Sequence, residues 1–134
     1  MLKVFDIAAS AMQAQSQRLN AVASNIANAE SASSNAETGY RAKQVVFQTT
    51  MLDAKTQSAG VKVANVQEDQ SPLRPVYNPG HPLANDKGYV FMPNVNPVSE
   101  MADMLSSSRA YQMNVDVMNS AKTLSQKALQ IGTE

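Results

Sequence analysis

His81 has the clearest capacity for chemistry, because it is the only histidine in the chain. A catalytic histidine needs an orienting acid and a nucleophile, and the sequence contains no GxSxG elbow and no HExxH motif. A second histidine that could share a metal with it is also missing. Gly80 and Pro82 flank His81 within a turn-rich stretch, so we interpret it as a loop residue.

The acidic side chains of the middle of the chain do not form a pattern with chemical function. Asp86 follows Asn85, but the alternating acidic ligands and the final Glu of a calcium loop are missing. Glu68 and Asp69 are adjacent, and adjacent residues of an extended segment point to opposite faces. Glycine-rich phosphate loops are also absent. We therefore expect no enzyme, no catalytic residue, no cofactor, no metal and no small-molecule substrate.

Composition limits the class of protein further. The 134 residues, 43% of them hydrophobic, suit one domain with one core. There is no cysteine, and the formal net charge of +0 is spread without a basic face, so we expect no disulfide and no nucleic-acid partner. No apolar run reaches the ~18 residues of a membrane span, and the N-terminus lacks the features of a cleaved signal peptide.

Glycine and proline are absent from two long windows, residues 1–38 (up to Gly39) and 98–131. Both residue types disfavour helix interiors, so the windows predict two long helices. We expect an N-terminal helix over 1–30, a β-rich middle over 31–96 and a C-terminal helix over 97–134, with the helices sharing one core. Asn96 and Pro97 suit the start of the second helix, with Ser99 as a rival cap, and Gly132 suits its end.

Apolar residues in the first helix repeat at alternating steps of three and four, which places them on one side. This seam contains Phe5, Ala8, Met12, Gln15, Leu19, Val22, Ile26 and Ala29. A second stripe beside it contains Val4, Ile7, Ala11, Ala14 and Ala21. Two stripes make a face wider than one partner helix covers, so we expect this helix to contact more than one other helix.

The second helix also shows two apolar stripes. One contains Met101, Met104, Ser108, Tyr111, Val115 and Met118, and the other contains Val117, Ala121, Leu124, Ala128 and Ile131. These patterns predict that the terminal helices pair as a coiled-coil stalk. The fold class is then α+β.

The middle region predicts short strands and turns. Residues 42–48 and 60–66 have β-strand character, and frequent prolines after residue 71 restrict the rest to edge strands and extended loops. Turns are expected at 78–80 and 86–88, and a loop at 30–38. We expect the whole middle region to form a small β-rich head on the helical stalk.

The end of the first helix carries a motif of a known group. Residues 25–29 read NIANA and residues 39–41 read GYR, which resembles the axial proteins of the bacterial flagellum. Residues 30–38 replace the short Thr-Pro link that is usual there. Further segments read YRAKQVVF at 40–47, GHPL at 80–83, KGYV at 87–90, MPNVN at 92–96 and SRAYQ at 108–112. As a set, over essentially the whole chain, they resemble the proximal rod proteins of the FlgC family.

This resemblance implies a structural subunit of the flagellar basal body. Such a subunit is exported by the flagellar type III apparatus without a cleaved signal peptide and polymerises into the periplasmic rod through its terminal helices. The implied partners are other rod proteins, the adaptor at the rod base, the membrane ring, the export apparatus and copies of the chain itself. With the stripes, the resemblance gives these assembly-interface residues: Phe5, Met12, Leu19, Val22, Asn25, Ile26, Asn28, Tyr111, Val115, Val117, Met118, Leu124 and Ile131.

A second class of protein would use the same apolar stripes. A cytoplasmic coiled-coil adaptor, or a flagellar export chaperone, would clasp a client with them. Protease sensitivity separates the two classes, because a chaperone presents stable helices alone, whereas an unassembled rod subunit loses its termini quickly.

Overall fold

Two terminal helices and two small antiparallel sheets make up the protein. A computed structural model describes residues 2–53 and 57–132. The elements, in chain order, are α1 (Leu2–Ala27), β1 (Lys43–Asp53), β2 (Ser58–Glu68), β3 (Arg74–Tyr77), β4 (Tyr89–Met92) and α2 (Pro97–Ile131). This architecture confirms the prediction of an α+β fold with helices at both ends and a small β middle.

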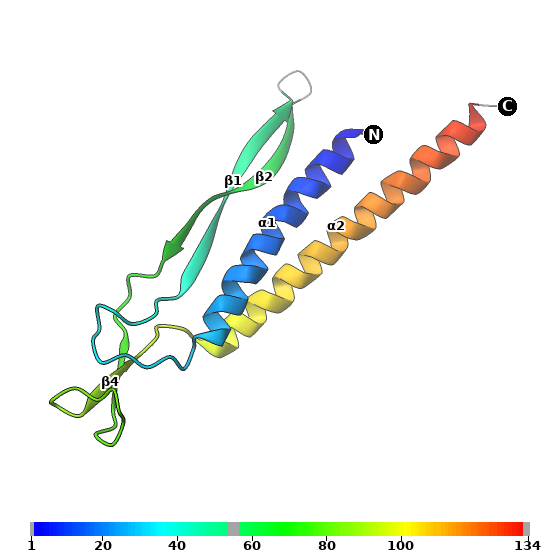
Figure 1. Cartoon of the computed structure of the whole chain (residues 1–134). Helices are drawn as coiled ribbons and strands as arrows, with labels where there is room; N and C mark the ends of the chain where they lie inside the picture. The colour runs from blue at the N-terminus through cyan, green and yellow to red at the C-terminus, as the bar shows by residue number, and fades with distance from the viewer. Residues whose placement is uncertain (1, 54–56, 133–134) are drawn as a thin grey trace.

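The helices run antiparallel, because both chain termini lie at the same end of the molecule (Figure 1). α2 begins where the sequence predicts: the side chain of Asn96 accepts hydrogen bonds from the backbone of Val98 and Ser99, and Pro97 occupies the first turn. At the other end, the backbone N–H of Gly132 donates to the carbonyl of Ala128. α2 has 35 residues and α1 has 26, so part of α2 extends past its partner.

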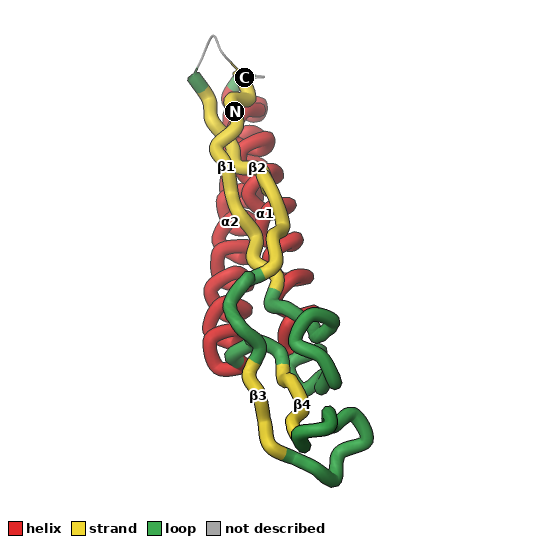
Figure 2. The backbone as a smooth tube through the Cα atoms, turned by 90° about the vertical axis from the view of Figure 1, so that its left-hand side faces the viewer, coloured by secondary structure: helices red, strands yellow, loops and turns green. Residues whose placement is uncertain are grey.

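The long hairpin of β1 and β2 lies along α1 and does not belong to the head. Its strands pair from Lys43 with Glu68 to Asp53 with Ser58, and register shifts mark two irregularities. α1 lies between this hairpin and α2 (Figure 1), and the strands run along the helices in the perpendicular view (Figure 2). The prediction that the whole middle region forms a head is therefore wrong.

Contact with the hairpin accounts for part of the second stripe of α1. Ser10 accepts a hydrogen bond from the backbone N–H of Val61 at 3.2 Å. Ala14, which is buried, lies with Val61 and Val63 around a small cavity between the helix and β2. Val4 and Ile7 of the same stripe are exposed, so the contact of α1 with more than one other helix stays a prediction about neighbouring subunits.

The head consists of β3, β4 and the loops around them, at the lower end of the molecule in Figure 2. Tyr77 and Tyr89 pair across the strands, and their rings meet edge to face at 5.2 Å. The predicted loop at 30–38 is present, and a bridge between Ser33 and Phe91 fastens it to β4. The predicted turns also occur, and Gly88 adopts a positive φ of 79° in the second.

Small side chains dominate the buried apolar residues, which lets the elements approach closely but buries little area. These residues are Ala8, Ala14, Ala21, Val22, Ala29, Ala42, Leu73, Val90, Val95 and Ala121. Many larger apolar side chains consequently remain at the surface. Neither described helix contains an apolar stretch that could cross a bilayer.

Candidate assembly surfaces

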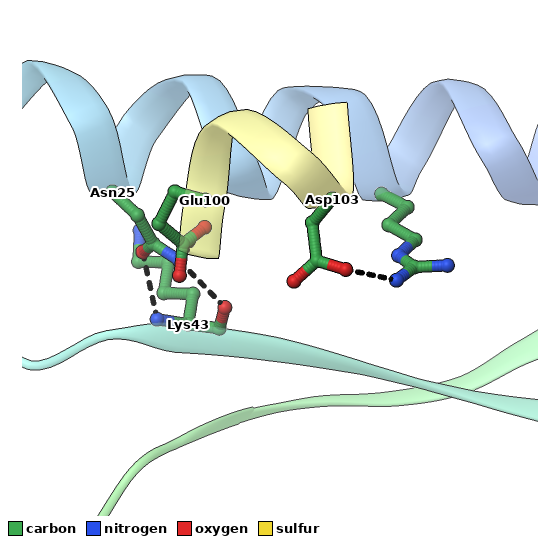
Figure 3. A network of polar contacts seen from close by, with 5 residues as sticks. Asn25, Lys43, Glu100 and Asp103 are labelled. Carbon is green, nitrogen blue, oxygen red and sulfur yellow. Dashed lines mark hydrogen bonds and ion pairs between the residues drawn. The ribbon is translucent and has the colours of Figure 1, made fainter. Parts of the chain in front are cut away.

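Asn25 is the node that joins both helices to the long hairpin. Its side chain is 1% exposed, yet it uses its full hydrogen-bonding capacity. The amide nitrogen donates to the Lys43 carbonyl at 2.9 Å and to Glu100 Oε2 at 3.1 Å. The amide oxygen accepts from the Lys43 N–H at 2.8 Å and from the Tyr40 hydroxyl at 2.9 Å. Figure 3 shows Asn25, Lys43 and Glu100 converging from α1, β1 and α2.

The neighbouring residues of the NIANA motif close the end of α1. The side chain of Asn28 donates to the carbonyl of Ser24 at 2.8 Å, and the backbone N–H of Asn28 donates to the same carbonyl at 3.1 Å. The hydroxyl of Ser24 lies 3.0 Å from that of Tyr40. The motif therefore ends the helix and directs Tyr40 and Lys43 back toward it.

A second polar cluster holds the chain where β1 begins and β2 ends. Asn94 donates to the carbonyls of Asp69 and Ser71, both at 3.0 Å, and accepts from the N–H of Ala42 at 2.8 Å. Arg41 also donates to the carbonyl of Ser71, at 2.9 Å. Hydrogen bonds from the Ser71 hydroxyl and backbone N–H, with the charge of Arg41, hold the pKa of Asp69 below its ordinary value.

An ion pair links the two helices about two turns from Asn25 along α1. Arg18 donates to Asp103 Oδ1 at 2.7 Å (Figure 3). The side chains are 31% and 45% exposed, so water screens the pair and its contribution to stability is modest. Its geometry nevertheless fixes which residue of α2 faces Arg18.

The face of α2 that is turned toward α1 consists largely of polar or small residues. The buried or half-buried positions recur mainly at steps of three and four. They are Glu100, Asp103, Met104, Ser107, Ala110, Asn114, Val115, Met118, Ala121 and Ser125. Ser107 is 0% exposed. Within the described part of the chain, Ser107 Oγ and Gln15 Oε1 are buried without a hydrogen-bond partner.

A broad apolar surface of α2 stays uncovered. Val117, Leu124 and Ile131 recur at seven-residue intervals, and Leu124 and Ile131 are 61% and 78% exposed. We call the full set the outer apolar surface, and it contains Val98, Met101, Leu105, Met113, Val117, Leu124 and Ile131. Exposed apolar side chains gathered on one element mark a site of protein–protein contact.

The residues assigned to the assembly interface divide between the two helices. Those of α1 are covered: Val22 and Asn25 are buried, and the half-buried ones are Phe5, Met12, Leu19, Ile26 and Asn28. On α2, Val115 and Met118 are half-buried. The exposed ones are Tyr111, Val117, Leu124 and Ile131.

The predicted stripes of α2 are covered only in part. Met104, Val115 and Met118 are half-buried and Ala121 is buried, whereas Met101 and Ser108 are exposed. The covered side also includes polar residues such as Ser107, which apolar periodicity does not select. Val98, Leu105 and Met113 were missed because they fall outside both stripes. The seven-residue step from Val98 to Leu105 was the available signal.

The described residues do not suggest a ligand site. A cavity of about 520 Å³ lies between α1, β1 and the start of α2. Its charged lining includes both Arg18 and Lys43 and the acidic Glu100 and Asp103, so neither sign dominates. Among the described residues there is no group of His, Cys, Asp or Glu suited to a metal ion. His81 Nδ1 accepts from the N–H of Leu83 at 3.0 Å, which is a local turn contact.

Two family models match the chain. Residues 5–31 match the flagella basal body rod protein family. Residues 86–131 match the C-terminal family of flagellar basal body rod FlgEFG proteins. The matches fall on α1 with the turn after it, and on β4 with α2.

Several proteins that are similar over nearly the whole chain are flagellar basal-body rod proteins named FlgC. The chain is 53% identical over 132 residues to the flagellar basal-body rod protein FlgC of Escherichia coli O6:H1, covering 98% of both chains. It is 51% identical to FlgC of Salmonella typhimurium, again over 98% of both. Identity to FlgC of Bacillus subtilis is 39%, over 95% of both. The chain therefore belongs to the FlgC family of flagellar basal-body rod proteins, which are structural proteins and not enzymes.

Proposed function

We propose that the chain is a structural subunit of the proximal flagellar rod, and that it polymerises through α1 and α2 with copies of itself and with other rod proteins. The observation that carries the proposal is the outer apolar surface of α2. Residues such as Leu124 and Ile131 are exposed on an otherwise regular helix. A neighbouring subunit that covers them would remove this apolar area from water, which favours assembly.

The total surface of the chain supports the same proposal. The chain exposes 9006 Å². A compact monomer of its mass, 14.4 kDa, would expose about 6,800 Å². The excess of roughly 2,000 Å² is comparable with the area that a stable protein–protein interface buries.

Within one subunit, we propose that α1 and α2 pair as a coiled coil and share one core. The covered residues from Phe5 to Ala29 follow alternating steps of three and four, and those of α2 from Glu100 to Ser125 include the same spacing except at Tyr111, which is exposed. This spacing supports the proposal, since it is the repeat by which two helices keep one seam in contact over many turns.

Membership of the family supports a proposal for the place of assembly. We propose that the flagellar type III apparatus exports the subunit without a cleaved signal peptide and that it assembles in the periplasmic rod. The adaptor at the rod base, the membrane ring and the other rod proteins are the proposed neighbours. The name shared by the relatives, basal-body rod protein, supports this location.

The test is complementation of a flagellated strain that lacks this gene. Met113→Asp and Val117→Asp place a charge on the outer apolar surface, whereas Gln126→Asp places one at an exposed polar position of the same helix. We expect the first two variants to be produced and exported but to lose swimming and hook-bearing basal bodies, and Gln126→Asp to retain both. Complete rods in the deletion strain would overturn the proposal. A wild-type protein that stays in the cytoplasm bound to a client would indicate the adaptor or chaperone instead.

A further inference from the structure

We propose that the Arg18–Asp103 ion pair, together with the Asn25–Glu100 hydrogen bond, sets the rotation of α2 about its own axis and so determines which face of α2 is presented for assembly. This inference deepens the proposed function, because the presented face is the outer apolar surface assigned there to subunit contacts. Arg18 and Asp103 are positioning residues in this view.

Burial of apolar area alone does not select the observed rotation of α2. The covered face mixes polar residues such as Glu100, Ser107 and Asn114 with apolar ones. Leu105, Met113 and Leu124 are more than 60% exposed on the other side. The hydrophobic effect has no direction of its own and favours whichever rotation covers more apolar surface. A directional contact is therefore needed to hold the observed face against α1.

The helix contact also contains groups that work against it. Ser107 Oγ and Gln15 Oε1 are buried without partners in the described part of the chain, and such groups lose their hydrogen bonds to water. Around Ser107 and Gln15, the contact between α1 and α2 therefore neither buries the most apolar area nor satisfies every polar group. Interactions elsewhere along the two helices must compensate for this cost.

Two directional contacts lie close to this level. Arg18 meets Asp103 at 2.7 Å, and Asn25 meets Glu100 at 3.1 Å. Glu100 and Asp103 are three residues apart, so they project from neighbouring positions on one side of α2, and Figure 3 shows both turned toward α1. Rotating α2 to bury its apolar side would separate both pairs. Buried and half-buried polar contacts between helices have this use, because they fix register and orientation at some cost in stability.

Three consecutive serines provide a direct readout of rotation. Ser107 is 0% exposed, while Ser106 and Ser108 on either side are exposed. The chain has no cysteine, so Ser106→Cys and Ser107→Cys each create a single thiol of nearly the same size as the serine it replaces. The ratio of their rates of alkylation reports which side of α2 faces α1.

The experiment measures this ratio on the purified full-length chain. We expect Ser106→Cys to react much faster than Ser107→Cys. Arg18→Glu, which sets two carboxylates against each other, should reduce the ratio by roughly threefold or more. Adding Asp103→Arg to Arg18→Glu should restore it. Arg18→Met, which keeps an apolar stem and removes the charge, should give a smaller reduction, and far-UV circular dichroism identifies any variant that has lost its helices.

Each contrary result is informative. Equal reactivity of the two thiols in the otherwise unchanged chain would overturn the inference. So would an unchanged ratio in a helical Arg18→Glu variant, or a charge reversal that fails to restore the ratio. A failure of the proposed function would give a different pattern of results. The alkylation ratio would respond as expected, while variants of the outer apolar surface would still build complete rods.

Discussion

The side chain of Asn25 binds both backbone groups of Lys43, donating to its carbonyl at 2.9 Å and accepting from its N–H at 2.8 Å. A residue of α1 thus takes the place that a neighbouring strand would have beside β1. Because Asn25 also donates to Glu100, one buried amide fixes the start of the hairpin and the start of α2. This relationship gives the NIANA motif a physical role that its sequence does not reveal.

Replacing Asn25 should therefore be costly. Asn25→Ala removes four hydrogen bonds made by a side chain that is 1% exposed, and we expect a loss of roughly 2 to 4 kcal/mol in the free energy of unfolding. Asn25→Asp brings a carboxylate against Glu100 and the Lys43 carbonyl, and we expect about 3 to 5 kcal/mol near neutral pH. Urea unfolding followed by circular dichroism measures both.

Asn28→Ala is the matched control for Asn25. Its amide makes a local bond to Ser24 at the helix end, so we expect a loss of only about 1 kcal/mol. Equal losses at Asn25 and Asn28 would show that Asn25 does not hold the three elements together.

The terminal helices were predictable because their signals are local. Absence of glycine and proline defined both windows, and Asn96 with Pro97 marked the start of α2. The position of the hairpin was not predictable. A strand in which apolar and polar residues alternate indicates that one face is buried, but it does not indicate which element covers that face. The contact between Ser10 and Val61 joins residues 51 positions apart, and no local pattern encodes it.

The face that α2 turns toward α1 was not predictable for a related reason. Apolar periodicity assumes that the apolar side of a helix faces the rest of its own chain. In a subunit that assembles, the apolar side can serve a neighbour, and polar pairs such as Arg18 with Asp103 then fix the internal contact. Arg18 and Asp103 are 85 positions apart, so composition and spacing gave no signal for their contact.

Gly60 should be intolerant of a side chain, because the hairpin approaches α1 at this point. A Cβ at Gly60 would lie 2.6 Å from Ser10 Oγ and 2.9 Å from Leu52 Cδ1. We expect Gly60→Ala to lower the free energy of unfolding by about 1 to 3 kcal/mol, as overpacking does. Chemical denaturation gives the value.

Two further variants test whether the clash with Ser10 causes the loss of stability in Gly60→Ala. Gly80→Ala meets only the side-chain oxygen of Asn78, at 3.9 Å, so it should change stability by less than about 0.5 kcal/mol. Ser10→Ala should cost less in the Gly60→Ala background than alone, because it removes the clashing oxygen. Additive effects of Ser10→Ala and Gly60→Ala would argue against direct contact.

Asp69 should make stability depend on pH in the acid range. Its pKa is lowered in the folded state, so its contribution is complete above the ordinary aspartate pKa of about 3.9 and is lost as the pH falls through the lowered value. The Ser71 hydroxyl is the largest cause of the lowering. Ser71→Ala should therefore destabilise the protein more near pH 6 than near pH 3.

The control for this pH dependence is Ser71→Ala in a protein whose Asp69 carboxylate has been replaced by an amide. In the Asp69→Asn background, Ser71→Ala should cost the same at both pH values, because residue 69 no longer titrates. Unfolding curves at the two pH values provide the comparison. A pH-dependent cost of Ser71→Ala that persists with Asn at 69 would assign the effect to another group.

Ser107→Ala should be tolerated in spite of complete burial. The hydroxyl is 0% exposed and unpartnered in the described part of the chain, so removing it relieves a desolvation cost and leaves a void no larger than one oxygen atom. We expect stability to stay within about 0.5 kcal/mol of the parent or to rise by about 1 kcal/mol. Ser107→Val adds bulk at a fully buried position of α2, and it should cost about 1 to 3 kcal/mol. Thermal unfolding of the two variants makes the comparison, and a marked loss for Ser107→Ala would mean that the hydroxyl has a bound partner, such as a water shared with Gln15.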